Sequence, residues 1–204
     1  MKQTTVTETV FTLDELSDTA RQKALETMCT YMHEWIEGDQ ITEYLNGELL
    51  AILTGECVGE ISSKELKGYV GLQIEWSLSH SQGDGVAIYG TVYANEAPKL
   101  EWHNADNACL TRNHYGTYYS HYNTFDVVVC GEDENGNYTT LDGDTGEAIT
   151  DQFRNICRQL SRLGYQALEN LTGEEAIYDH LECHGERRFT ENGDIIHASF
   201  WSDK

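Results

Sequence analysis

The residues whose types and spacing could support chemistry occur first in a glycine-rich segment, Ser81–Gly85, with the sequence Ser-Gln-Gly-Asp-Gly. His80 precedes it and Asp84 lies within it, which would bring an imidazole and a carboxylate close together. A phosphate-binding loop needs glycines that lead into a helix or lie beside a basic residue. Here a strand-like run follows and no lysine is adjacent. We therefore interpret the segment as a turn that sets the register of a hairpin.

A second polar segment, Gly131–Asn137, contains Asp133 and Asn135 and is followed by Asp142 and Asp144. Such oxygens superficially resemble calcium ligands. An EF-hand, however, needs a fixed series of oxygen ligands that ends in a bidentate glutamate between two helices, and that series is absent. The six cysteines are scattered and form no Cys-x-x-Cys spacing, so zinc is not indicated either. We predict no metal site and no cofactor.

Histidines and tyrosines gather between His103 and Tyr122. Imidazoles suit a metal, and aromatic rings can stack on nucleic-acid bases. Base binding also needs neighbouring cations, and only Arg112 is close, so we predict no direct binding of nucleic acid. Packing against helices is the favoured interpretation. Exposed tyrosines would be anchors of a protein interface, and the candidates are Tyr118, Tyr119 and Tyr122.

Three arginines recur at helical spacing, Arg154, Arg158 and Arg162. We expect them to pair with carboxylates of neighbouring elements, and an anion site is the alternative. None of the sequence motifs of serine hydrolases, zinc proteases, P-loop proteins or dinucleotide-binding enzymes is present. We therefore predict that the protein is not an enzyme, and a small metal-dependent enzyme remains the catalytic alternative.

The strongest compositional signal is charge, because 35 Asp and Glu stand against 13 Lys and Arg, a net charge of −22. A compact chain of this length has a diameter of about 45 Å, and a DNA duplex of that length carries about 26 charges. The excess of carboxylates is therefore enough to imitate a phosphate backbone. The alternative is that the charge only keeps the protein soluble and monomeric. The acidic residues that we predict to bind a partner are Glu34, Glu37, Asp39, Glu43, Glu132, Asp133, Glu134, Asp142, Asp144, Glu174 and Glu175.

These side chains need a folded scaffold, and 39% hydrophobic residues with 21 aromatic rings suffice for a core. Apolar residues at helical spacing predict four helices. Thr12 and Glu15 fit a capping box at the start of the first helix. The expected helices are Phe11–Trp35, Asp39–Leu53, Thr150–Leu171 and Glu174–Cys183.

Alternation of apolar and polar residues predicts strands, beginning with Tyr69–Ser79 and its hairpin partner Val86–Tyr93. Further strands are expected at Tyr115–Tyr122 and Phe125–Cys130, and Gly131–Gly146 is a polar loop or holds a short strand near Tyr138. Asn192-Gly193 predicts a final hairpin of Arg188–Thr190 with Ile195–Trp201. The order of elements predicts an α+β fold, an antiparallel sheet of about four to six strands packed with N-terminal and C-terminal helices. With one proline and no linker composition, we expect a single domain, residues 1–204.

Three segments carry a resemblance to a family of uncharacterised proteins encoded by phages and prophages. The most specific is Trp76–Gly85, with the sequence Trp-Ser-Leu-Ser-His-Ser-Gln-Gly-Asp-Gly, and the others are Phe11–Ser17 and Arg188–Gly193. Together they cover about a ninth of the chain. The resemblance implies origin in a mobile element and no particular activity.

Charge and resemblance together predict an acidic inhibitor or DNA-mimic decoy of the anti-CRISPR or anti-restriction type. Its partner would be a positively charged nucleic-acid-binding protein of the host. The alternative is a protein-interaction or morphogenesis module that uses the aromatic surface. The first residues contain no apolar run typical of a signal peptide, and no stretch is long enough to span a membrane. We therefore expect a cytoplasmic protein of an infected or lysogenic bacterial host, with reduced cysteines.

Overall fold

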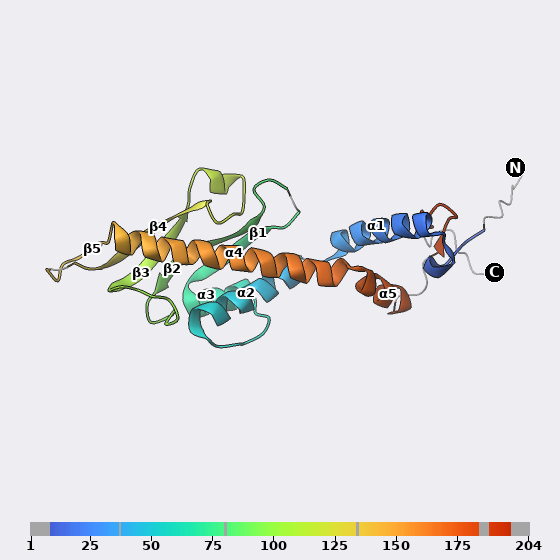
Figure 1. Cartoon of the computed structure of the whole chain (residues 1–204). Coiled ribbons are helices and arrows are strands. Elements are labelled where there is room, and N and C mark those ends of the chain that lie inside the picture. Colours follow the sequence, from blue (N-terminus) through green and yellow to red (C-terminus); the bar gives the residue numbers. More distant parts are fainter. Residues whose placement is uncertain (1–8, 37, 80, 134, 184–187, 197–204) are drawn as a thin grey trace, which may run out of the picture. The chain divides into compact units, whose positions relative to one another are not determined.

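The computed structural model describes residues 9–36, 38–79, 81–133, 135–183 and 188–196 (Figure 1). The chain divides into two compact units, a larger one of residues 38–167 and a smaller one formed by residues 1–37 with 168–204. The described residues form five α-helices and a five-stranded antiparallel sheet, which confirms the predicted α+β class and the predicted size of the sheet. The prediction of a single domain stays a prediction, and each unit is described by itself.

The larger unit is built on a sheet whose strands are neighbours in chain order and pair antiparallel throughout. One face is apolar, since Ile74 is paired with Ile88 and Leu110 with Val127. The opposite face carries side chains such as Gln73 and Asp126, which are exposed. The strands are β1 (Leu72–Ser77), β2 (Gly85–Tyr93), β3 (Ala105–Arg112), β4 (Phe125–Glu132) and β5 (Tyr138–Thr140).

Helices α2 (Gly38–Thr54) and α3 (Ser63–Val70), with residues 144–167 of α4 (Asp144–Thr172), complete the larger unit. Their apolar stripes and the apolar face of the sheet share one core, in which each buried large side chain stabilises by about 1.5–3 kcal/mol. The largest fully buried side chains of this unit are Ile41, Leu45, Leu49, Leu50, Leu53, Leu66, Leu72, Ile88, Phe125 and Phe153. A Cβ on Gly164 of α4 would lie 2.6 Å from the Leu78 side chain, so the helix packs closely where β1 ends.

Three expectations about this unit are corrected. Tyr69 and Val70 belong to α3, which a capping box between Ser62 and Glu65 starts, so β1 begins only at Leu72. The polar residues between Glu101 and Arg112, where no strand was expected, contain β3, whose buried positions are two alanines and one leucine. The expected strand Tyr115–Tyr122 is instead a 3₁₀ turn, Tyr115–Thr117, followed by a loop. Asn113 causes this difference, because its Oδ1 accepts hydrogen bonds from the backbone N–H of Tyr115 and Gly116.

The smaller unit packs α1 (Asp18–Trp35) against α5 (Glu174–Cys183). A 3₁₀ turn, Leu13–Glu15, precedes α1, and a short hairpin of β6 (Arg188–Phe189) and β7 (Ile195–Ile196) follows α5. The hairpin was predicted, although residues 197–201 of its second strand lie outside the described residues. The core of this unit consists of Leu13, Leu16, Ala20, Ala24, Met28, Ile177, Leu181 and Phe189.

All six cysteines are thiols without a disulfide, and Cys157 is buried in the core of the larger unit. Within the part of the chain that the structure describes, no helix is long and apolar enough to cross a membrane.

Candidate functional site

Segments that carry acidic residues lie together at one end of the larger unit, where β4 ends, β5 forms the edge and α4 begins (Figure 1). Glu101 lies there as well, because its backbone N–H and C=O both bond the Gln152 side chain at 2.9 Å. Apart from Asp133, which is half-buried, these side chains are exposed. We call this set the acidic end, and it consists of Glu101, Glu132, Asp133, Asp142, Asp144, Glu147 and Asp151.

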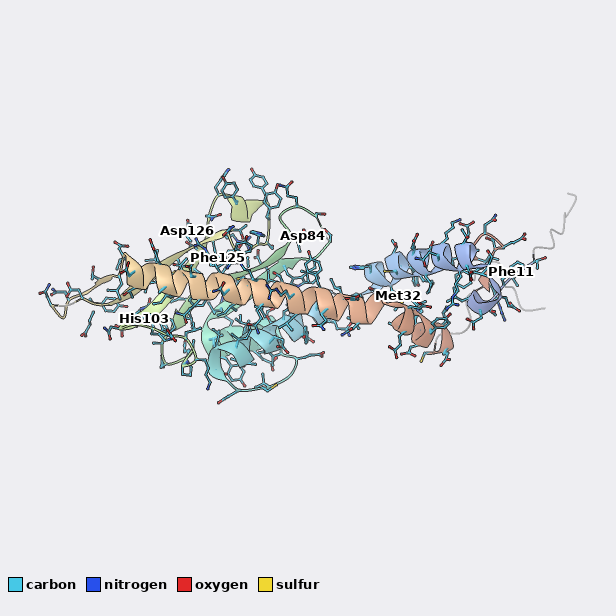
Figure 2. The ribbon with its side chains drawn as sticks, in the orientation of Figure 1. Phe11, Met32, Asp84, His103, Phe125 and Asp126 are labelled. Carbon is cyan, nitrogen blue, oxygen red and sulfur yellow. The ribbon has the colours of Figure 1, made fainter. Side chains whose placement is uncertain are left out.

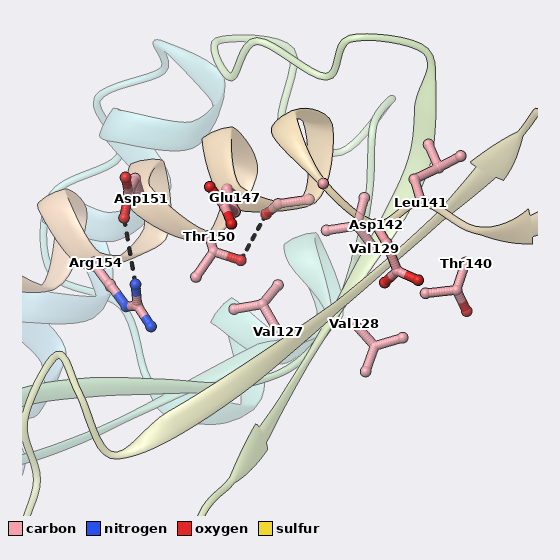
Figure 3. Close-up of a pocket in the computed structure, with 12 residues that line it drawn as sticks. Val127, Val128, Val129, Thr140, Leu141, Asp142, Glu147, Thr150, Asp151 and Arg154 are labelled. Atoms are coloured by element: carbon pink, nitrogen blue, oxygen red, sulfur yellow. Dashed lines mark hydrogen bonds and ion pairs between the residues drawn. The ribbon is translucent and has the colours of Figure 1, made fainter.

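A groove of about 540 Å³ lies within the acidic end, between the edge of β4 and the first turns of α4 (Figure 3). Its walls combine apolar side chains with charged ones. Among the described lining residues Arg154 is the sole cation, and its Nη1 lies 3.4 Å from Asp151 Oδ1. The residues that line the groove are Val127, Val128, Val129, Thr140, Leu141, Asp142, Gly143, Gly146, Glu147, Thr150, Asp151 and Arg154.

Part of the acidic end has a local structural role. Asp144 and Glu147 lie in the first turn of α4, where the helix dipole favours negative charge. Asp133 Oδ1 accepts the N–H of Asn135 and Asn137, both at 2.8 Å, and these hydrogen bonds lower the pKa of Asp133. Within the described residues Glu132 and Asp142 have neither role, and both side chains are exposed, so their carboxylates can contact a partner.

The other predicted acidic residues do not join the acidic end. Asp39 and Glu43 lie on α2, beside β1 at the opposite edge of the sheet, where the Trp76 indole N–H donates to Thr42 at 3.0 Å. Glu174 and Glu175 begin α5 of the smaller unit, and Glu174 pairs with Arg21 at 2.8 Å. Glu37, Glu134 and the side chain of Glu34 lie outside the described residues.

The second candidate surface is the loop of residues 113–124, which we call the tyrosine loop. Tyr115, Tyr118 and Tyr119 expose 64%, 72% and 49% of their surface, which is unusual for rings of this size. His114 lies against two of them, with ring centroids 5.7 and 5.9 Å from those of Tyr115 and Tyr118. The sequence predicted Tyr118 and Tyr119 as anchors but not Tyr115, although Tyr115 belongs to the same tyrosine-rich segment.

The third predicted anchor, Tyr122, is engaged inside the protein instead. Its ring stacks on His121 with centroids 4.0 Å apart, and the Arg158 guanidinium lies 4.1 Å from its centroid. Burial, together with the charge of Arg158, lowers the pKa of His121. Arg158 thus holds the end of the tyrosine loop against α4. The arginines of α4 were expected to pair with carboxylates of neighbouring elements, but Arg154 pairs with Asp151 of the same helix, and Arg158 bonds Asn155, also of α4, at 2.6 Å.

Asp84 organises the Trp76–Gly85 segment, which connects β1 to β2 (Figure 2). Its Oδ1 accepts the hydroxyl of Ser77 at 2.6 Å. Its Oδ2 accepts the N–H and hydroxyl of Ser79, each at 2.8 Å, and the N–H of Ser81 at 2.6 Å. Burial alone would raise the pKa of Asp84, but these hydrogen bonds outweigh it and lower the pKa. Local donors occupy both oxygens, which supports the interpretation as a structural turn, while His80 lies outside the described residues.

No group of three or more His, Cys, Asp or Glu side chains within the described residues is arranged to hold a metal ion. Comparison of the chain with protein-family models, with curated proteins and with solved structures finds no match. The proposed function therefore rests on the acidic end and the tyrosine loop.

Proposed function

We propose that this protein is an acidic decoy that binds a positively charged, nucleic-acid-binding protein through the acidic end of its larger unit. The observation that carries the proposal is the convergence of carboxylates from the loop before β3, from the β4–β5 hairpin and from α4. Mimicry of a phosphate backbone requires charge gathered on one surface, because dispersed charge gives only solubility. Carboxylates gathered in this way can form charge-assisted hydrogen bonds with the Lys and Arg side chains of a nucleic-acid channel.

The resemblance to phage-encoded proteins directs the choice of partner. Proteins of mobile elements meet host nucleases that cut nucleic acid, so CRISPR effectors and restriction enzymes are the partners to test first. The protein would then act in the cytoplasm of a bacterial host, as an anti-CRISPR or anti-restriction inhibitor without catalysis of its own.

The decisive experiment compares two variants with the same change in net charge. The first reverses the acidic end with Glu132→Lys, Asp142→Lys, Asp144→Lys and Asp151→Lys. The matched control reverses four acidic residues around α2 with Asp39→Lys, Glu43→Lys, Glu56→Lys and Glu60→Lys. Both variants and the unchanged protein are used to capture partners from a bacterial lysate, and each recovered partner is then tested for competition with duplex DNA.

We expect the unchanged protein to displace duplex DNA from its partner and to lose affinity steeply as salt rises. The acidic-end variant should bind at least about 100-fold more weakly, whereas the control should change by less than about threefold, since rim charges contribute little. Equal losses in the two variants would show that total charge matters and not the acidic end. A partner whose binding is indifferent to salt and to DNA would exclude the decoy.

A second candidate function rests on the tyrosine loop. Three exposed tyrosines on one short loop are typical of interface anchors, since such rings bury a large area with little loss of conformational freedom. A protein-interaction or morphogenesis module would use this surface and retain its charge for solubility. In that case Tyr118→Ala or Tyr119→Ala would weaken partner binding more than reversal of the acidic end, and binding would respond little to salt.

A further inference from the structure

We propose that the groove of the acidic end receives an extended, basic segment of the partner, which pairs with the edge of β4 as an additional strand. This inference rests on the proposed function, because it specifies how a basic partner is engaged. The groove of about 540 Å³ runs along the edge of β4 between Val127–Val129 and α4 (Figure 3). It therefore offers both backbone groups and carboxylates to one ligand.

The edge of β4 is only partly covered by β5. β5 pairs with Cys130–Glu132, and Leu141 adds one hydrogen bond from its N–H to the C=O of Val129 at 2.8 Å. That carbonyl therefore points away from β3. Backbone groups alternate in direction along a strand, so Val127 also directs its N–H and C=O away from β3. Within the described residues no strand is paired with β4 on this side at Val127.

An unpaired strand edge is a template for another strand, and natural proteins usually cover or shorten such edges. The part of β4 beyond the Leu141 hydrogen bond, from Phe125 to Val128, extends over about 10 Å at the normal rise of a strand. This length accommodates about three to four residues of an added strand. Val128 exposes 44% of its surface on the face of the sheet opposite α4, which gives an incoming strand an apolar contact.

The charges around this edge favour a basic segment. Asp142, Glu147 and Asp151 line the groove, and Arg154 opposes them alone among the described lining residues. Arg154 is itself weakly held, because its ion pair with Asp151 is 3.4 Å long and its buried Nε has no acceptor among the described residues. Its guanidinium can therefore turn toward a backbone carbonyl of the added strand. Main-chain hydrogen bonds would then give affinity, and alternate lysines or arginines would give selectivity.

The test uses a hexapeptide of alternating lysine and valine with blocked ends, and the same peptide with every amide N-methylated. Both carry the same charge, but in the second the methyl groups remove every N–H donor and clash with a neighbouring strand, so only the first can pair with the edge of β4. Amide hydrogen exchange at Val127 is measured by NMR in the full chain, with and without each peptide. We expect the unmethylated peptide to slow exchange at Val127 by at least about tenfold at saturation, and the methylated peptide to leave it unchanged.

A charge-neutral variant completes the test. Asp142→Asn, Glu147→Gln and Asp151→Asn retain the shape of the groove and should weaken binding of the unmethylated peptide about tenfold. The matched control, Asp39→Asn, Glu43→Gln and Glu56→Gln, should bind it unchanged within about twofold.

The outcomes separate this inference from the proposed function. Equal binding of the two peptides without protection of Val127 would overturn strand addition, while attraction of basic partners to the acidic end would still stand. Failure of both peptides to bind would overturn strand addition as well, and capture of a DNA-competing partner would still decide the decoy. Protection of Val127 by the unmethylated peptide alone, lost in the charge-neutral variant, would establish the groove as the docking site.

Discussion

Carboxylates differ in role between two regions of the larger unit. One is the turn that Asp84 organises between β1 and β2, which we call the Asp84 turn, and the other is the acidic end. Four donors from Ser77, Ser79 and Ser81 occupy both oxygens of Asp84, which leaves this carboxylate little capacity for a partner. Glu132 and Asp142 are exposed at the acidic end, and no such donor contacts them within the described part of the chain. Hydrogen bonds from neighbouring donors therefore distinguish a structural carboxylate from a carboxylate that can bind a partner. Substitutions in the two regions should therefore change stability and binding in opposite ways.

The largest effect on stability is expected from Asp84→Ala. It removes the acceptor of four hydrogen bonds at once and should lower the free energy of unfolding by about 3 kcal/mol, since bonds to charged groups are the stronger ones. Asp84→Asn keeps one oxygen and should cost about 1 kcal/mol. Urea unfolding measures both, with Asp126→Ala as control, because Asp126 is an exposed aspartate of β4 (Figure 2). An Asp84→Ala protein as stable as the control would mean that the turn does not depend on this carboxylate.

The dependence of stability on acidic pH provides a second test of Asp84. The pKa of Asp84 lies below its ordinary 3.8, so its contribution to stability is present above that value and is lost as pH falls below it. The unchanged protein should therefore lose stability more steeply than Asp84→Asn does as pH falls below about 4. Thermal unfolding over this range checks the prediction, and parallel curves would contradict it.

Sequence alone predicted the elements with strong periodicity. α2 and α5 were expected within one residue of their bounds, because apolar stripes at helical spacing leave little ambiguity. The ends of α1 and α4 were also predicted, but their starts were wrong: α1 begins at Asp18 and not Phe11, and α4 begins at Asp144 and not Thr150. β3 was missed because its buried positions, Ala105, Ala108 and Leu110, are mostly small and lie among polar residues.

For the candidate surfaces, the sequence predicted individual residues but not which of them lie close together. Sequence selected Glu132, Asp142 and Asp144, but their convergence with Glu101 and Asp151 depends on the sheet order and on where α4 begins. No local pattern contains that information. The packing of Tyr122 could not be predicted either, since its contact with Arg158 joins residues 36 positions apart in the chain. Side-chain chemistry is local, whereas the formation of a surface is a property of the topology.

Gly83→Ala should have the next largest effect and tests whether the Asp84 turn also depends on backbone shape. Gly83 has a φ of +93°, and an added Cβ would lie 2.5 Å from the Tyr119 ring. We expect a loss of about 2 kcal/mol from backbone strain and from displacement of Tyr119. Gly68→Ala is the matched control, because nothing lies within 4 Å of its Cβ, and it should gain about 0.5–1 kcal/mol in a helix. Equal stability of the two variants in urea unfolding would contradict the assigned strain.

Arg158→Gln tests the attachment of the tyrosine loop to α4. Loss of the guanidinium over the Tyr122 ring should cost about 0.5–1 kcal/mol. Since the charge of Arg158 also lowers the pKa of His121, the variant should raise that pKa toward its ordinary value, while burial keeps it below. An NMR titration of His121 measures the shift. Arg162→Gln is the control on the same helix, and an equal shift in both variants would show that Arg158 has no special contact with His121.

The smallest effect on the free energy of unfolding is expected at the acidic end, where the direction of the change shows whether the carboxylates stabilise the fold. Glu132→Gln with Asp142→Asn removes two carboxylates that repel their neighbours, so stability should rise by a few tenths of a kcal/mol at low salt. The gain should vanish at about 0.5 M salt, because screening already removes the repulsion there. Asp144→Asn, at the start of α4, should instead lose about 0.5 kcal/mol with the helix dipole. If neutralising Glu132 and Asp142 lowered stability, these carboxylates would serve the fold as Asp84 does, and the distinction between the two regions would fail.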